Sequence, residues 1–123
     1  MRVLAIDDSR TIRDMVRLTL EREGIETTLA EDGLRGIEIL EGLDPRPDAI
    51  LTDVNMPRLD GFGFIERVRQ RAEYAGIPIL VLTTESAREL KLRARAAGAT
   101  GWIVKPFDPA RLVGALRTVT GLL

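Results

Sequence analysis

Short apolar runs alternate with longer amphipathic stretches along the whole chain, and this alternation constrains the fold more than any other feature. Continuous apolar runs of this length suit strands that are buried on both faces of a parallel sheet. The second run, "IETTL", is more polar than the others, as expected of an edge strand. The expected strands cover residues 3–6, 25–29, 49–52, 77–83 and 101–104.

Between these runs, apolar residues recur at helical spacing. In the first stretch, Ile12, Val16 and Leu20 share one face, and arginine and glutamate occupy the other. Glycine is common just beyond the end of a helix, as at Gly24 and Gly98, and Asp-Pro is a good helix start. The expected helices include residues 12–20, 34–43, 62–68, 90–97 and 109–119, the last one preceded by Asp108.

Five strand–helix units in series predict an α/β fold. Right-handed crossovers place the helices on both faces of a parallel sheet, in a flavodoxin-like, doubly wound arrangement with strand order 2-1-3-4-5. The length of 123 residues suits one domain. We therefore expect a single domain over residues 1–123, with no output domain after the fifth helix.

The composition excludes several classes of function. The chain has no cysteine and no histidine, so it offers neither thiolate nor imidazole ligands, and any histidine chemistry must come from a partner. A net charge of −1 argues against nucleic-acid binding. No signal peptide and no membrane-spanning apolar run is visible, so we expect a soluble cytoplasmic protein.

Acidic residues follow two strands that neighbour each other in the expected sheet. Asp7 and Asp8 follow the first, and Asp53 follows the third, with Asn55 two residues later. Ligands of doubly wound sheets bind at the carboxyl ends of the strands, so these acids should converge. Because clustered carboxylates repel one another, a hard divalent cation such as Mg²⁺ is expected there.

Two further polar residues end the fourth and fifth strands. Lys105 would add positive charge to the acidic cleft, and Thr83 would add a hydroxyl donor. Together these groups suit a phosphoryl group, and Asp53, at the centre, is a candidate nucleophile that would form an acyl phosphate.

Each of these residues alone also allows a purely structural explanation. Asp7 and Asp8 could cap the first helix, and Asp53 with Asn55 could form an Asx-turn. Lys105 could be a solvated loop charge, Thr83 an ordinary strand residue and Trp102 a packing residue. The coincidence of the polar residues at one edge of one sheet favours the functional interpretation, because capping does not require it.

Four segments, "AIDDSR", "DVNMPRLDG", "VLTTES" and "GWIVKPF", resemble the motifs of response-regulator receiver domains. The resemblance covers essentially the whole chain and is strongest to the CheY-like, single-domain chemotaxis regulators. It implies that Asp53 accepts a phosphoryl group from a histidine kinase of the CheA type, and that the protein is a signalling switch rather than an enzyme.

The resemblance also implies the remaining roles at the site. Asp8 and Asp53 would bind Mg²⁺ directly with the backbone carbonyl of Asn55, and Asp7 would act largely through water. Lys105 would pair with the phosphoryl oxygens, and its peptide bond to Pro106 is expected to be cis.

Signalling would involve Thr83 and Trp102. Thr83 would move toward the phosphoryl group, and Trp102 would swing inward and reshape the face made by the fourth helix, fifth strand and fifth helix. Trp102 replaces the usual Tyr or Phe, and its indole N–H needs a hydrogen-bond acceptor. Asn55 and Glu85 are the pair found in relatives that lose phosphate quickly, whereas Thr84 is bulkier than the usual small residue and could oppose that loss.

Several partners and functions remain open at this level. The target could be a flagellar motor switch protein. Alternatively, the chain could pass its phosphoryl group to a histidine phosphotransferase in a phosphorelay, or act as a sink that drains phosphate from a shared kinase. The protein is expected to be a monomer. An aspartate phosphatase is less favoured, because Asn55 replaces the usual second Asp. A flavin or nucleotide binder is disfavoured, since no glycine-rich phosphate loop follows the first strand. The basic stretch 88–95 suggests an acidic or amphipathic target segment.

Overall fold

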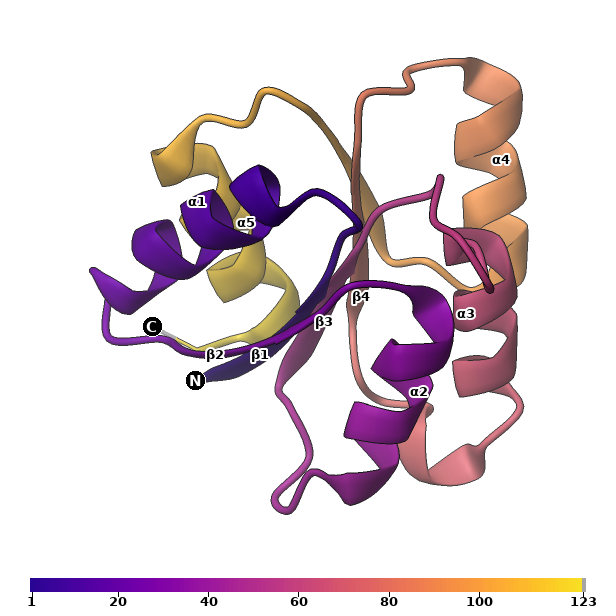
Figure 1. Ribbon diagram of the computed structural model, residues 1–123, viewed down its shortest axis with the longest axis horizontal. Coiled ribbons are helices and arrows are strands. Elements are labelled where there is room, and N and C mark those ends of the chain that lie inside the picture. Colours follow the sequence, from indigo (N-terminus) through magenta and orange to yellow (C-terminus); the bar gives the residue numbers. More distant parts are fainter. Residues whose placement is uncertain (123) are drawn as a thin grey trace.

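The five apolar runs form one parallel sheet in the order β2-β1-β3-β4-β5 in a computed structural model, which describes residues 1–122. The flavodoxin-like order predicted from the sequence is confirmed, and the more polar second strand does lie at an edge (Figure 1). The strands are β1 (Arg2–Ile6), β2 (Glu26–Ala30), β3 (Ala49–Thr52), β4 (Ile79–Thr83) and β5 (Gly101–Val104).

Helices cover both faces of this sheet. α1 and α5 lie on one face, and α2, α3 and α4 lie on the other (Figure 1). Their bounds are α1 (Arg10–Glu21), α2 (Gly33–Gly42), α3 (Gly61–Arg69), α4 (Arg88–Ala97) and α5 (Pro109–Thr120), and a short 3₁₀ helix, η1 (Ala72–Tyr74), precedes β4. Within residues 1–122, every helix is too short or too polar to cross a bilayer.

The core consists of two apolar layers, one on each side of the sheet. Alternate residues of β1 enter opposite layers: Leu4 and Ile6 pack under α2–α4, and Val3 and Ala5 pack under α1 and α5. β3 is likewise buried along its whole length. A strand that needs apolar side chains on both faces reads as a continuous apolar run, which is why the sequence located these strands.

The helix starts are set mainly by capping side chains. Ser9, rather than Asp7 or Asp8, caps α1, since its Oγ accepts a hydrogen bond from the Ile12 N–H at 3.3 Å. The capping alternative for the two aspartates is therefore wrong. Asp108 caps α5 as predicted, and Gly98 ends α4 with a φ of +115°. α1, in contrast, ends at Glu21, before the turn that contains Gly24.

Gly61 allows α3 to start directly beneath the loop that follows β3. Its N–H donates to the Val54 carbonyl at 2.8 Å. A Cβ atom at this position would lie 2.2 Å from the Asp53 carbonyl oxygen and 2.9 Å from the Val54 Cα. Because both neighbours are backbone atoms, neither can move aside without displacing the chain at Asp53.

We predict that Gly61→Ala destabilises the protein by about 1–3 kcal/mol, the usual cost of overpacking. Gly114→Ala is the matched control, because Gly114 lies inside α5 with no atom within 4 Å of its added Cβ. That variant should be more stable than wild type by up to about 1 kcal/mol, through helix propensity alone. Urea unfolding measures both changes, and equal effects of the two substitutions would contradict the packing argument.

Candidate functional site

Three carboxylates meet at the carboxyl ends of β1 and β3. Ile6 and Thr52 are register partners in these adjacent parallel strands, so the residues that follow them, Asp7 and Asp53, emerge side by side. One carboxylate oxygen each from Asp7, Asp8 and Asp53 lies within 4.8 Å of the others. Asp7 and Asp53 are buried and Asp8 is exposed, which leaves the cluster open to solvent on one side.

Lys105, just beyond β5, bridges the two buried carboxylates. Its Nζ lies 2.6 Å from Asp7 Oδ2 and 3.1 Å from Asp53 Oδ2, and its side chain is only 8% exposed. The remaining oxygens accept backbone hydrogen bonds: Asp7 Oδ1 from Ser9 N–H at 2.9 Å, and Asp53 Oδ1 from Val54 N–H at 2.7 Å. The alternative that Lys105 is a solvated loop charge is therefore wrong.

The peptide bond between Lys105 and Pro106 is cis. A second cis bond, Asp44–Pro45, lies in the loop between α2 and β3 and was not expected from the sequence. The Lys105 N–H donates to the Thr83 carbonyl at 2.8 Å, so the residue that bears the ammonium is attached to the end of β4.

Burial determines the electrostatics of this cluster. Burial raises the pKa of Asp7, although hydrogen bonds from Lys105 and the Ser9 N–H act in the opposite direction. Burial disfavours the Lys105 ammonium, but its hydrogen bond with Asp7 and the charges of Asp7 and Asp53 outweigh this effect, so the pKa of Lys105 is raised. Three acids beside one ammonium leave more acidic than basic groups in the cluster, which favours binding of a divalent cation.

The geometry of the three acids fits Mg²⁺. Two oxygens bound to one Mg²⁺ at about 2.1 Å can lie no more than about 4.2 Å apart. The carboxylate oxygens of the three acids lie within 4.8 Å of one another, so they need to approach by only a few tenths of an ångström to share one ion. Carboxylate oxygens are the ligands that this ion prefers, and an exposed side leaves room for the waters it retains. Asn55, whose carbonyl was the fourth predicted ligand, is an exposed residue in the same loop as Asp53.

A short chain of hydrogen bonds leads from this site to β5. Thr83 is fully buried, and its Oγ1 accepts a hydrogen bond from the Glu85 N–H at 3.3 Å. The Glu85 carbonyl accepts a hydrogen bond from Trp102 Nε1 at 2.9 Å, and the half-buried indole packs against the core under α2–α4. The sequence predicted that the indole N–H needs a partner, but nothing in the sequence identified the Glu85 carbonyl. Thr84, which lies between Thr83 and Glu85 in the chain, is exposed.

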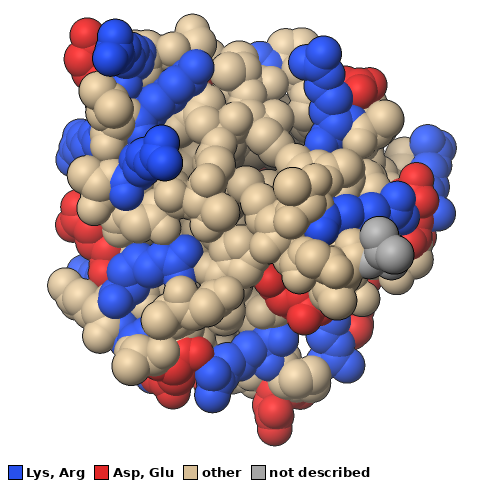
Figure 2. Space-filling view, turned by 180° about the vertical axis from the view of Figure 1, so that it is seen from behind, with Lys and Arg blue, Asp and Glu red and all other residues tan. Residues whose placement is uncertain are grey.

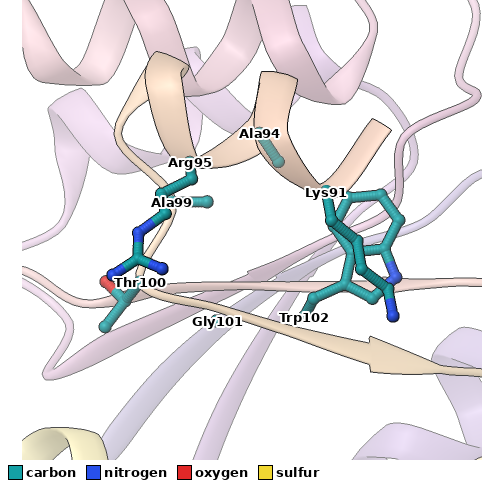
Figure 3. A pocket seen from close by; sticks show the side chains of 7 residues that line it. All are labelled: Lys91, Ala94, Arg95, Ala99, Thr100, Gly101 and Trp102. Carbon is teal, nitrogen blue, oxygen red and sulfur yellow. The ribbon is translucent and has the colours of Figure 1, made fainter. Parts of the chain in front are cut away.

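Trp102 also borders a pocket of about 240 Å³ between α4 and β5. The Lys91 and Arg95 side chains extend from α4 along this pocket, toward Trp102 on β5 and Thr100 just before that strand (Figure 3). Two cations beside an indole suit a ligand that combines acidic and apolar groups.

Comparison with known proteins gives a consistent result. The model of the response regulator receiver domain family matches residues 3–117. Chemotaxis protein CheY1 of Helicobacter pylori is 37% identical over 98% of each chain. The structure of chemotaxis protein CheY4 of Vibrio cholerae is 46% identical, with a TM-score of 0.90 over 96% of this chain and 97% of that one.

One similar structure contains a metal ion. The receiver domain of a sensor histidine kinase from Pseudomonas aeruginosa PAO1 is 28% identical, with a TM-score of 0.89 over 98% of this chain and 97% of that one. That structure has a magnesium ion coordinated in its active site cleft.

We predict that Mg²⁺ stabilises the protein against urea, by about 2.7 kcal/mol when the free ion is at 100 times its dissociation constant. Asp8→Asn and Asp53→Asn should each abolish most of this gain, since each removes a charged ligand from the cluster. Asp14→Asn is the control, because Asp14 is an exposed acid on α1 outside the cluster. Equal stabilisation of all three variants by Mg²⁺ would show that the ion binds elsewhere.

Proposed function

Because the chain belongs to the response regulator receiver domain family, we propose that it is a phosphorylation-controlled signalling switch in which Asp53 accepts a phosphoryl group from a histidine kinase. The observation that carries this proposal is the placement of Lys105, whose ammonium lies within 3.1 Å of a buried Asp53 oxygen beside a second buried acid. The similarity to chemotaxis regulators suggests chemotaxis as the process that the switch controls.

The reaction places the phosphoryl donor outside this chain. A carboxylate oxygen of Asp53 attacks the phosphorus of a phosphohistidine, the P–N bond breaks, and the electron pair stays on the imidazole nitrogen of the donor. The product is an acyl phosphate on Asp53. Since the chain has no histidine, the donor belongs to the kinase.

Asp7, Asp8, Asp53 and the Asn55 carbonyl are the groups that would hold Mg²⁺. When bound, the ion supplies positive charge that offsets the charge on the transferring phosphoryl oxygens. Lys105 would supply the second positive charge: its ammonium would move from the Asp53 oxygen to a phosphoryl oxygen, while its contact with Asp7 at 2.6 Å keeps the amine in the site.

We predict that wild-type protein gains the mass of one phosphoryl group when incubated with Mg²⁺ and a small phosphodonor or a phosphorylated histidine kinase. Asp53→Asn should show no gain, because the amide is a poor nucleophile. Asp60→Asn is the control, since Asp60 caps α3 through a side-chain oxygen outside the cluster. Equal incorporation in wild type and Asp53→Asn, measured by intact-mass spectrometry, would assign the phosphoryl group to another residue.

The phosphoryl group should be short-lived. Asn55 and Glu85 flank the expected path of an attacking water, and Asn55 is exposed while Glu85 is only half-buried. Their partial exposure leaves solvent access to the site on this side.

We predict that Asn55→Arg slows hydrolysis of the acyl phosphate, by about tenfold or more if the guanidinium pairs with the phosphoryl oxygens and excludes water. The decay is followed by radiolabel loss after removal of the phosphodonor. Thr84→Ala tests whether the threonine side chain restricts the access of water to the acyl phosphate. If it does, this variant should lose the phosphoryl group faster than wild type. An Asn55→Arg protein that decays at the wild-type rate would remove this position from control of lifetime.

The face formed by α4, β5 and α5 is the proposed output surface. On the side seen in Figure 2, Lys and Arg side chains, interspersed with Asp and Glu, surround a largely uncharged centre. α4 carries Arg88, Lys91, Arg93 and Arg95 against one acid, Glu89, and Arg93 is engaged over the Phe62 ring at 4.2 Å. Charge complementarity therefore favours an acidic, amphipathic target segment.

We predict that an acidic amphipathic peptide binds the phosphorylated protein with an affinity that falls as salt is raised, since exposed charges are screened. Combined Lys91→Gln and Arg95→Gln substitution should weaken binding and flatten the salt dependence. Combined Arg10→Gln and Arg17→Gln substitution, at two exposed positions of α1, is the matched control for loss of two positive charges. Fluorescence titration measures both, and a salt-independent affinity would contradict charge-steered recognition.

A further inference from the structure

An ion pair outside the acid cluster links the loop after β3 to the start of α2. The Arg58 guanidinium donates two hydrogen bonds to one carboxylate, from Nε to Asp32 Oδ2 at 2.9 Å and from a terminal nitrogen to Asp32 Oδ1 at 3.0 Å. Asp32 is 5% exposed, and it also caps α2 by accepting the Arg35 N–H at 2.8 Å. Arg58 lowers the pKa of Asp32 mainly through these hydrogen bonds.

The backbone at Arg58 needs such a restraint. Its φ of +67° is in the left-handed region, and within residues 1–122 it is the one residue other than glycine with positive φ. Side chains disfavour this conformation, so surrounding contacts must maintain it. The Leu59 N–H donates to the Pro57 carbonyl at 2.8 Å and closes a tight turn around Arg58. The bidentate ion pair to a buried, helix-capping acid is the side-chain contact that joins this turn to α2.

Backbone contacts extend the same connection. The Gly33 N–H donates to the Leu59 carbonyl at 3.2 Å, and a Cβ atom on Gly33 would lie 2.3 Å from that oxygen. At the other side of the loop, Gly61 N–H holds the Val54 carbonyl at 2.8 Å. The loop is thus fixed at Val54, Arg58 and Leu59, whereas Asn55 lies between these points, exposed and without a hydrogen bond among residues 1–122.

We propose that the Arg58–Asp32 ion pair is a latch that positions the Asn55 segment beside the acid cluster, and so sets both the affinity for Mg²⁺ and the rate of phosphoryl uptake by Asp53. This inference rests on the proposed function of the site. Arg58 acts as a positioning residue, because it contacts neither the carboxylate cluster nor the reacting atoms. Small displacements of groups that position reactants reduce rates by large factors, which makes a remote ion pair effective.

Two variants remove the ion pair while they preserve the fold around it. Arg58→Gly removes the guanidinium but makes the left-handed backbone favourable, so the folded state is retained. Asp32→Asn removes the charge but keeps a side-chain oxygen that can cap α2. Arg35→Ala is the control, since it removes an exposed ion pair with Glu38 from the same helix.

The measurements are Mg²⁺ affinity by isothermal titration calorimetry and phosphoryl uptake from a small phosphodonor, both far below the unfolding midpoint. We expect Arg58→Gly and Asp32→Asn each to slow uptake by about tenfold. Each should also weaken Mg²⁺ binding, while Arg35→Ala matches wild type. The double variant should be no worse than either single one, because both remove the same contact. Arg58→Lys, which keeps the charge but loses the bidentate geometry, should be intermediate.

Two results would overturn the latch. Folded Arg58→Gly and Asp32→Asn proteins with wild-type Mg²⁺ affinity and wild-type uptake would show that the ion pair only stabilises the loop. Additive losses in the double variant would show that the two residues act separately. A wild-type protein that takes up no phosphoryl group would instead contradict the proposed function, and the calorimetric comparison would still decide whether the latch controls the metal site.

Discussion

The ammonium of Lys105 between Asp7 and Asp53 is the interaction on which the site depends. These contacts join residues 98 and 52 positions apart, so they form only when β1, β3 and β5 are aligned in one sheet. Removing one partner from a buried ion pair commonly costs about 3–5 kcal/mol, because the other charge is left without compensation. The cluster still contains more negative than positive charge, so one lysine stabilises the acids without neutralising them. That imbalance leaves a folded site with a remaining affinity for a cation.

The sequence predicted most of this architecture because the sheet is buried on both faces. Strand β3, for example, has no exposed residue, so it is apolar from Ala49 to Leu51, and its one polar residue, Thr52, satisfies its hydroxyl by donating to the Asp53 carbonyl. Once the strand order is known, the convergence of Asp7 and Asp53 follows from the register Ile6–Thr52. Element ends were less accurate: the predicted run from Ile77 starts as a strand only at Ile79, after Pro78, which has no N–H to donate.

The sequence did not identify two contacts that side chains make with groups far away in the chain. Asp32, just before Gly33, is recognisable as a helix cap. Its pairing with Arg58, however, joins two loops 26 residues apart, and the sequence of neither loop indicates that the other lies beside it. The partner of the Trp102 N–H is a carbonyl group, and every residue has one. Such contacts depend on how elements pack, whereas periodicity and capping depend on neighbours in the chain.

The site and the proposed output surface are connected through one residue. Glu85 donates its N–H to the Thr83 hydroxyl and accepts the Trp102 N–H at its carbonyl, so both hydrogen bonds belong to the same short segment after β4. In the proposed function, a phosphoryl oxygen on Asp53 would accept a hydrogen bond from the Thr83 hydroxyl, whose oxygen already accepts the Glu85 N–H. Any movement of Thr83 toward that oxygen would alter the backbone that holds the indole. A ligand shifts a conformational equilibrium only by its difference in affinity between the two states. The indole position therefore matters for signalling only if the target contacts Trp102 or the α4–β5 pocket that it borders, where Lys91 and Arg95 provide the charge.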